Sequence, residues 1–198
     1  DEKHAGWLLE KGFRKVSAIV EYTRSLDKTF ALEPGIVAES LADSNMDDAS
    51  FAYLYERCRS GSANKNNLFT IEQVMESLEK ELGSKWRTHC YLFRKYGESM
   101  GLSIPHLEEG TIDEGRLFYF GVVPEHRQKG YGAVFHRLSL GLLKNFVATT
   151  YVGSTDENNR QMICIFEQNG CRLRDKKGIY RINRKEEYSE NHKSPLIE

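Results

Sequence analysis

A basic turn with two glycines joins an apolar strand to an apolar-rich helix, and this part of the sequence constrains the fold most. The strand is expected over Leu117–Val123 and the helix over Tyr131–Phe146, with Gly130 and Gly132 where they meet. Glycine lets the backbone approach an anion closely. The first free N–H groups of a helix point at such an anion, with the positive end of the helix dipole behind them. The turn therefore predicts a site for a pyrophosphate-bearing ligand.

Arg127 and Lys129 are expected to add mobile positive charge to this turn. An ordinary surface turn has a similar composition, so the turn alone leaves both interpretations open. It is not a Walker loop, because Gly-x-x-x-x-Gly-Lys-Ser/Thr does not occur in the chain. It is not the dinucleotide fingerprint either, because a third glycine and the βαβ frame are missing.

A second segment downstream strengthens the interpretation as a phosphate site. A helix is expected from about Asn159 to Gln168, with Asp156 or Asn158 as its cap and Gly170 as its C-terminal stop. An apolar stripe follows one side of this helix and consists of Met162, Ile163, Ile165 and Phe166.

Together, the two segments resemble the GCN5-related N-acetyltransferase superfamily. Arg127-x-x-Gly130-x-Gly132 is similar to the pyrophosphate signature of that family. Its second motif has an asparagine, an aromatic residue seven positions later and a glycine eleven positions later, here Asn159, Phe166 and Gly170. The resemblance implies an α/β (α+β) fold, in which helices flank a central mixed, mostly antiparallel sheet, and it implies acetyl-CoA as the cofactor.

The resemblance also implies roles for particular residues. The pantetheine arm would pair with the backbone near Val122 like an extra strand, and the N–H groups from Gln128 to Ala133 would hold the pyrophosphate. Asn159 would contact the cofactor through its amide, and Phe166 would lie near the thiol. The complete expected cofactor-binding set is Val122, Val123, Arg127, Gln128, Lys129, Gly130, Tyr131, Gly132, Ala133, Asn159 and Phe166.

Acetyl transfer to an amine requires a bound thioester, removal of a proton from the amine and stabilisation of an oxyanion. Phe166 departs from the family here, since many members have a tyrosine whose hydroxyl protonates the departing thiolate. Another donor can serve, with Tyr131, Tyr119 and Tyr180 as candidates. Otherwise the thiolate leaves unassisted, or the domain binds the cofactor without efficient turnover.

The general base is equally open. Alignment on Pro124 places Arg116 where relatives commonly have a glutamate, and we favour Glu114, two residues earlier, as the catalytic carboxylate. His126 is interpreted as a surface residue. The other candidates for the base are Asp113, Glu108 and His106.

The order of predicted elements agrees with the acetyltransferase fold. Strands are expected near 29–33, at 90–95, 100–107, 117–123 and 148–154, and as a closing hairpin of 171–174 with 179–182. Helices are expected over 47–58, 70–82, 131–146 and 159–168, with a loop over 60–67. Thr70, with Gln73 three positions later, predicts a capping box at the start of the second helix.

Three regions are predicted: an N-terminal extension (1–27), the acetyltransferase domain (28–184) and a polar C-terminal tail (185–198). The extension echoes the end of the domain, because Gly12 precedes Tyr22 by ten positions and Gly170 precedes Tyr180 by ten. This echo leaves two interpretations open. The extension is either a plain amphipathic helix and strand that dock on the domain, or the end of a preceding acetyltransferase-like repeat.

Composition excludes some functions. The formal net charge of −1 provides no global field that recruits nucleic acid or an anionic membrane. Neither a membrane span nor a signal peptide is apparent. The four cysteines lack the spacing of a zinc site or a disulfide scaffold, so no metal and a cytoplasmic location are expected.

The sequence thus predicts an N-acetyltransferase that acts on a primary amine of a small molecule or peptide, with a homodimer possible. The alternative is a non-catalytic acyl-CoA-binding module, and a nucleotide-binding protein is a third class.

Overall fold

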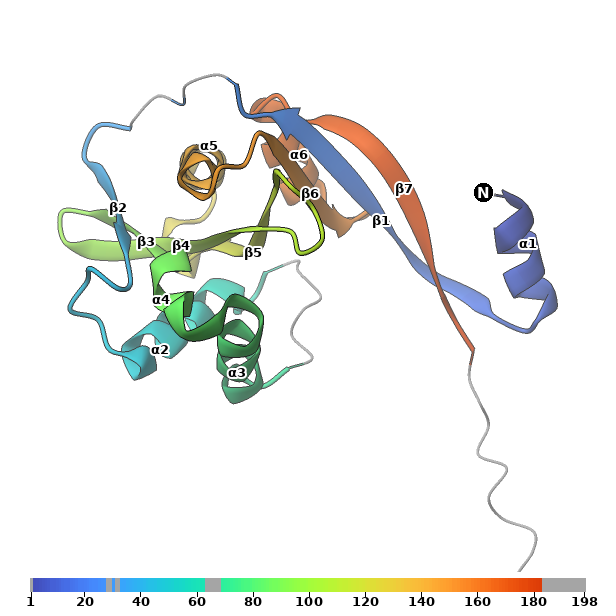
Figure 1. The fold of residues 1–198 in the computed structure, drawn as a ribbon, viewed down its shortest axis with the longest axis horizontal. Helices are drawn as coiled ribbons and strands as arrows, with labels where there is room; N and C mark the ends of the chain where they lie inside the picture. Colours follow the sequence, from blue (N-terminus) through green and yellow to red (C-terminus); the bar gives the residue numbers. More distant parts are fainter. Residues whose placement is uncertain (1, 28–29, 31–32, 63–68, 183–198) are drawn as a thin grey trace, which may run out of the picture.

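A seven-stranded sheet with the order β2-β3-β4-β5-β6-β1-β7 forms the centre of the computed structural model, which describes residues 2–27, 30, 33–62 and 69–182 (Figure 1). Neighbouring strands are antiparallel except β5 and β6, which are parallel. The predicted fold class is confirmed. The strands are β1 (Arg14–Ser25), β2 (Ile36–Ser40), β3 (Tyr91–Lys95), β4 (Glu98–Leu107), β5 (Glu114–Val122), β6 (Thr150–Asp156) and β7 (Arg172–Arg181).

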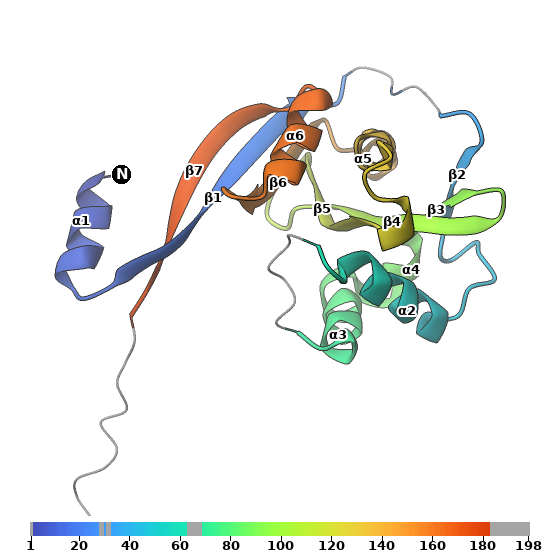
Figure 2. The same cartoon turned by 180° about the vertical axis from the view of Figure 1, so that it is seen from behind.

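Helices cover both faces of the sheet (Figures 1 and 2). One face carries α2 (Asp48–Arg59), α3 (Ile71–Leu82) and the short α4 (Trp86–His89). The other carries α5 (Tyr131–Leu142) and α6 (Arg160–Gln168), whereas α1 (Glu2–Glu10) lies beyond the sheet, at the start of β1. Within the described ranges, every helix is too short or too polar to cross a membrane.

Local sequence signals fixed the start of α3 as predicted. Thr70 is its N-cap, and the Gln73 N–H donates to the Thr70 hydroxyl (3.3 Å). In return, the Thr70 N–H donates to the side-chain oxygen of Gln73 (2.9 Å). This reciprocal pair satisfies two N–H groups that a helix start otherwise leaves without partners.

The predicted closing hairpin is wrong. Residues 172–181 form the single strand β7, whose partner is β1 from the other end of the chain. The Asp175-Lys176-Lys177-Gly178 stretch resembles a turn, but β1 pairs with it throughout and keeps it extended.

Other boundaries also differ from the predictions. Phe30 and Glu33 are not in a strand, and the domain's first edge strand is β2, at 36–40. The rest of the predicted 29–33 strand, most of the 60–67 loop and the 185–198 tail lie outside the described residues. The helix predicted over 131–146 ends at Leu142 and continues as a 3₁₀ turn to Phe146.

A polar group is buried in the core between α5, β6 and α6. His136 is completely buried, and its Nε2 lies 3.1 Å from the Tyr151 hydroxyl. Its Nδ1 accepts from the Asn169 amide at 3.0 Å, so Nε2 carries the proton. Burial lowers the pKa of His136 from 6.5 to about 3, so the ring is neutral at physiological pH.

This buried histidine should make the protein sensitive to acid. Because the folded pKa lies below that of the unfolded chain, the contribution is complete above pH 6.5 and is lost as the pH falls toward about 3. In that window the free energy of unfolding should fall by up to about 1.4 kcal/mol per pH unit from this group. In His136→Gln, the amide can keep both hydrogen bonds without titrating, so urea unfolding should depend less steeply on pH. Equal pH dependence of both proteins would contradict the argument.

Candidate functional site

The basic turn between β5 and α5 has the geometry of an anion cradle. Gly130 is the N-cap of α5 in the left-handed conformation (φ 83°), and no side chain caps the helix. Within the described part of the chain, the backbone N–H groups from Gln128 to Ala133 donate no hydrogen bond. A Cβ added at Gly130 would meet nothing within 4 Å, so this side of the turn is open. The turn therefore presents unpaired N–H groups at the positive end of a helix dipole.

Arg127 differs from the expectation of a mobile charge. Its Nε donates to the Val122 carbonyl (3.0 Å), and its guanidinium reaches the Cys58 carbonyl at the end of α2 (2.9 Å). The Val123 N–H is also occupied, by the Met100 carbonyl (3.0 Å). Arg127 thus fastens the turn to α2, and the groups available to bind a phosphate are the backbone N–H groups of the turn.

Gly132, the last glycine of the motif, serves helix packing. A Cβ there would lie 2.9 Å from Cδ1 of Ile165, so glycine lets this side chain of α6 pack directly on the backbone of α5. On the next residue, the Ala133 carbonyl accepts from the Asn169 amide at 2.9 Å, a second link between the two helices.

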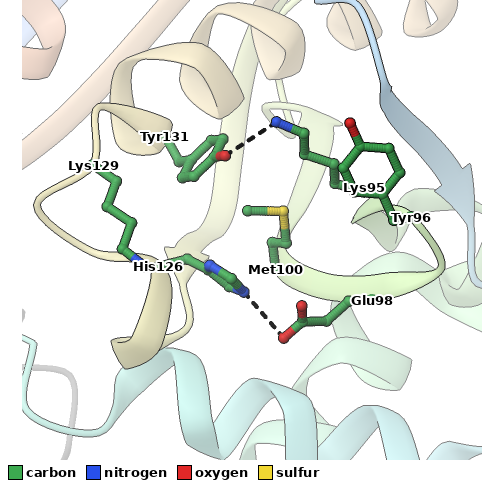
Figure 3. Close-up of a pocket in the computed structure, with 7 residues that line it drawn as sticks. All are labelled: Lys95, Tyr96, Glu98, Met100, His126, Lys129 and Tyr131. Carbon is green, nitrogen blue, oxygen red and sulfur yellow. Dashed lines mark hydrogen bonds and ion pairs between the residues drawn. The ribbon is translucent and has the colours of Figure 1, made fainter.

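A pocket of about 260 Å³ lies beside the turn, against the hairpin of β3 and β4 (Figure 3). The Lys95 ammonium donates to the Tyr131 hydroxyl (3.3 Å), and His126 pairs with Glu98 (3.1 Å). Lys129 also lines this pocket and has no acidic partner among the described residues. The pocket thus adds cationic side chains to the N–H groups of the turn, and His126, interpreted as a surface residue, is partly buried in the wall of this pocket.

The strands β5 and β6 part as they run away from their first residues. Over the described residues they pair only at Glu114 with Thr150 and at Gly115 with Tyr151. Farther on, β5 keeps β4 as its neighbour and β6 keeps β1. The facing edges beyond these pairs have no strand partner, and the turn follows the end of β5. An extended chain with amide groups could bind along them as a strand does.

Asn159 is the N-cap of α6, so the predicted caps Asp156 and Asn158 are wrong. Its Oδ1 accepts from the Met162 N–H (3.2 Å), and its Nδ2 donates to the Thr155 hydroxyl (3.0 Å). Both ends of the amide are therefore used within the protein. This residue fixes the start of α6, where the resemblance implies a cofactor contact.

Phe166 is buried, with 1% of its surface exposed, and stacks on Tyr22 of β1 at 5.0 Å between ring centroids. A Cβ built at Gly153 of β6 would lie 3.0 Å from Cε1 of Phe166 and closer still to the Tyr151 hydroxyl. A tyrosine hydroxyl from β6 therefore lies next to the ring that lacks one. Burial raises the pKa of Tyr151 well above its usual value, so the hydroxyl keeps its proton.

The three tyrosines named as substitute donors lie elsewhere. Tyr119 packs against Tyr55 in the core under α2 and α3 (4.2 Å). Tyr131 lines the pocket beside the turn, and Tyr180 is opposite Lys15 in the β1–β7 ladder. Tyr151 had no motif to mark it, and only tertiary packing brings it to Phe166.

Glu114 lies in a network of charged side chains between β1, β5 and β7. Its Oε1 accepts from Arg116 (2.6 Å) and its Oε2 from Arg174 (3.0 Å). Burial raises the pKa of Glu114, but these hydrogen bonds outweigh burial and hold the pKa below its usual range. The nearby Glu21, only 4% exposed, accepts from Lys177 (3.1 Å). A carboxylate held in this way is a weak proton acceptor, which disfavours the predicted role of Glu114 as the base.

Two of the other candidates for the base, Glu108 and His106, line the same pocket. Asp113 bonds Thr149 through its carboxylate, and Glu108 pairs with Arg116 (3.1 Å). His106 lies in a second pocket of about 480 Å³, and burial lowers its pKa, which favours the neutral ring. This pocket is lined by Glu81, Leu82, His89, His106, Leu107, Glu108, Glu109, Phe146 and Val147. Among the described residues, no cluster of side chains could hold a metal ion.

Comparison with solved structures identifies the fold. A GCN5-related N-acetyltransferase from Sphaerobacter thermophilus superposes with a TM-score of 0.69 over 91% of this chain, at 15% sequence identity. A GNAT-family acetyltransferase from Colwellia psychrerythraea gives 0.64 over 90% at 11% identity. A tandem GNAT protein from the clavulanic acid pathway gives 0.60 over 91% at 15% identity. The chain has the GCN5-related N-acetyltransferase fold.

The chain covers only part of these acetyltransferase structures, spanning 56%, 60% and 58% of their respective lengths. No protein-family model matches the sequence, and neither does any curated protein. The similarity therefore establishes the fold, whereas activity and substrates have to be argued from the residues of this chain.

Within this acetyltransferase fold, Gly130→Val tests the anion cradle. Valine would point a branched side chain into the open side of the turn, and its left-handed backbone would cost about 1–2 kcal/mol. Blocking hydrogen bonds to a charged phosphate should weaken acetyl-CoA binding about ten- to hundredfold in calorimetry.

Gly110→Val is the matched control. Gly110 has a similar φ of 80°, and an added Cβ there also meets nothing within 4 Å, but it lies in the loop between β4 and β5. It should lose similar stability and keep its affinity for acetyl-CoA. Unchanged affinity in Gly130→Val would show that the pyrophosphate is bound elsewhere.

Proposed function

We propose that the protein is an N-acetyltransferase that transfers acetyl from acetyl-CoA to a primary amine. The observation that carries this proposal is the unpaired N–H cradle at the end of β5, where β5 and β6 have already parted. At this position, the turn can bind the pyrophosphate of the cofactor while its amide-bearing pantetheine arm pairs with the open strand edges. The acetyltransferase fold of the chain supports the same conclusion.

In the proposed reaction, acetyl-CoA supplies the thioester, and the amine nitrogen bonds to the carbonyl carbon as the carbon–sulfur bond breaks. The unpaired backbone N–H groups hold the anionic end of the cofactor. Tyr151 is proposed to protonate the departing thiolate, because its hydroxyl lies beside Phe166, near which the resemblance places the thiol.

The acceptor amine must lose a proton before it attacks. His106 is the proposed acceptor of this proton, since its lowered pKa keeps the ring neutral at physiological pH. It lines the second pocket together with Glu81 and Glu109, whose negative charges suit an ammonium group. This pocket is proposed as the route by which a cationic amine reaches the sheet.

The activity is tested by amine-dependent release of free CoA thiol, measured with acetyl-CoA and a panel of primary amines. Turnover that requires both substrates would support the proposal. Binding of acetyl-CoA without turnover for any amine would favour the alternative, a non-catalytic acyl-CoA-binding module. This alternative is a specific second candidate because position 166 is phenylalanine, which cannot donate a proton to the thiolate. Binding of ATP in preference to CoA would contradict both.

Removing the Tyr151 hydroxyl tests the proposed proton donor. Tyr151→Phe should lower kcat tenfold or more, since proton transfer by a positioned group contributes about 10²–10⁴-fold. Its affinity for acetyl-CoA should not change.

Tyr22→Phe is the control, because it also removes a hydroxyl from a ring beside Phe166, but that hydroxyl points to Glu167 (3.3 Å). Its kcat should stay within about twofold. Equal losses in both variants would indicate that the hydroxyls act through packing alone.

A further inference from the structure

The two ends of the described chain contain the same structural unit, a helix that stops at a glycine and continues as a strand. In the first unit, the Gly12 N–H donates to the Leu9 carbonyl (3.0 Å) and the Phe13 N–H to the Leu8 carbonyl (3.0 Å). In the second, the corresponding bonds are Gly170 to Glu167 (2.9 Å) and Cys171 to Phe166 (2.9 Å). Both glycines are left-handed, with φ of 83° and 70°. Every corresponding pair of residues is 158 positions apart.

The two strands that follow, β1 and β7, are related by a local two-fold axis. Each starts two residues after its glycine, and their ladder runs from Arg14 opposite Arg181 to Thr23 opposite Arg172. At its centre, Ile19 faces Lys177, and these two residues are themselves 158 positions apart. The axis therefore passes through the ladder and exchanges the unit α1–β1 with the unit α6–β7.

The two units differ in what covers their helices. Phe166 of α6 is 1% exposed, and Ile165 packs against α5 at Gly132. The corresponding helix α1 lies away from the body of the domain in both views (Figures 1 and 2). Its Trp7, the counterpart of Ile165, is 51% exposed, and its Leu8, the counterpart of Phe166, is only partly buried. The apolar side that α6 buries is therefore open on α1.

The strand edges differ in the same way. Residues 19–23 of β1 lie between two strands, because β6 pairs with them on the side away from β7. The two-fold axis relates 19–23 to 177–181 of β7. There, only β1 pairs with β7, which is the last strand of the sheet within the described chain. An open strand edge is a template for another strand.

We propose that α1 and β1 are the closing helix and strand of a second acetyltransferase-fold body, which docks on the open edge of β7 and the apolar side of α1. One strand of that body would run antiparallel to residues 177–181, as β6 runs along β1. One of its helices would cover Trp7 and Leu8, as α5 covers the corresponding residues of α6. Since α1 and β1 complete this body, it precedes them in the same polypeptide. The proposal concerns assembly and does not depend on catalysis.

A second copy of the chain fits this surface less well. Its own β6 is already enclosed between β5 and β1, so it has no equivalent strand to offer. Pairing β7 with β7 would instead bring like charges together on an edge strand that carries Arg172, Arg174, Lys176, Lys177 and Arg181.

The experiment compares the polypeptide as the cell makes it, expressed from its complete coding region, with residues 1–198 alone. The complete coding region should encode an acetyltransferase-fold body ahead of α1. In hydrogen exchange, amides of α1 and residues 177–181 should be protected at least tenfold more strongly in the complete polypeptide. The absence of such a body, equal protection in both proteins, or protection gained through dimerisation of 1–198 would each overturn the proposal.

Trp7→Asp tests the contact directly. The aspartate should lower the Tm of the complete polypeptide by several degrees and that of 1–198 by about a degree or less, because Trp7 is half exposed in 1–198. Ile112→Asp is the control, since Ile112 is 94% exposed in the loop between β4 and β5, so this change should have little effect in either protein. Equal Tm changes for Trp7→Asp in both proteins would contradict docking on α1.

Discussion

The insertion of β1 between β6 and β7 is the interaction on which the rest of the structure depends. It supplies backbone partners to both neighbours, along 150–156 of β6 and 172–181 of β7. Without β1, the edges of β6 and β7 that it pairs with would lose their hydrogen bonds, and β7 would have no neighbouring strand within the described chain. Strands outside a larger sheet are at best marginally stable in water. The same strand places Tyr22 against Phe166 on one face and Glu21 among arginines and lysine on the other. One strand therefore closes the core and orders the charged network.

This arrangement also explains how β6 can part from β5. Each of the two strands keeps one paired edge where they part, so neither is left without a neighbour in the sheet. The far edge of β6 stays paired with β1 from Thr150 to Asp156, and the far edge of β5 stays paired with β4, while the edges that face each other stay open. The parting of the strands, on which the proposed cofactor site depends, is thus stabilised by a strand outside the stretch that carries the motifs.

The sequence predicted well what is decided locally. Thr70 and Gln73 interact within one turn of helix, and the left-handed Gly130 lies where a glycine was expected at the phosphate turn. What sequence reasoning missed depends on residues far apart in the chain. The sequence predicts a hairpin in place of β7 because the partner strand lies about 158 positions away in the chain. It predicts a mobile Arg127 because no neighbouring residue indicates the contact with the carbonyl of Cys58. No local pattern marks Tyr151 or Glu21, since their importance comes from tertiary packing alone.

Three side chains of the expected cofactor set hold the site together. Arg127 fastens the turn, Asn159 caps α6, and Phe166 fills the core. The groups left for a ligand are the backbone N–H groups of the turn, together with cationic side chains at the rim of the nearby pocket. Backbone donors fixed by a rigid scaffold need little reorganisation when an anion binds. An anion site built from such backbone donors depends little on the identity of the surrounding side chains, provided that the glycines and the fastening contacts persist.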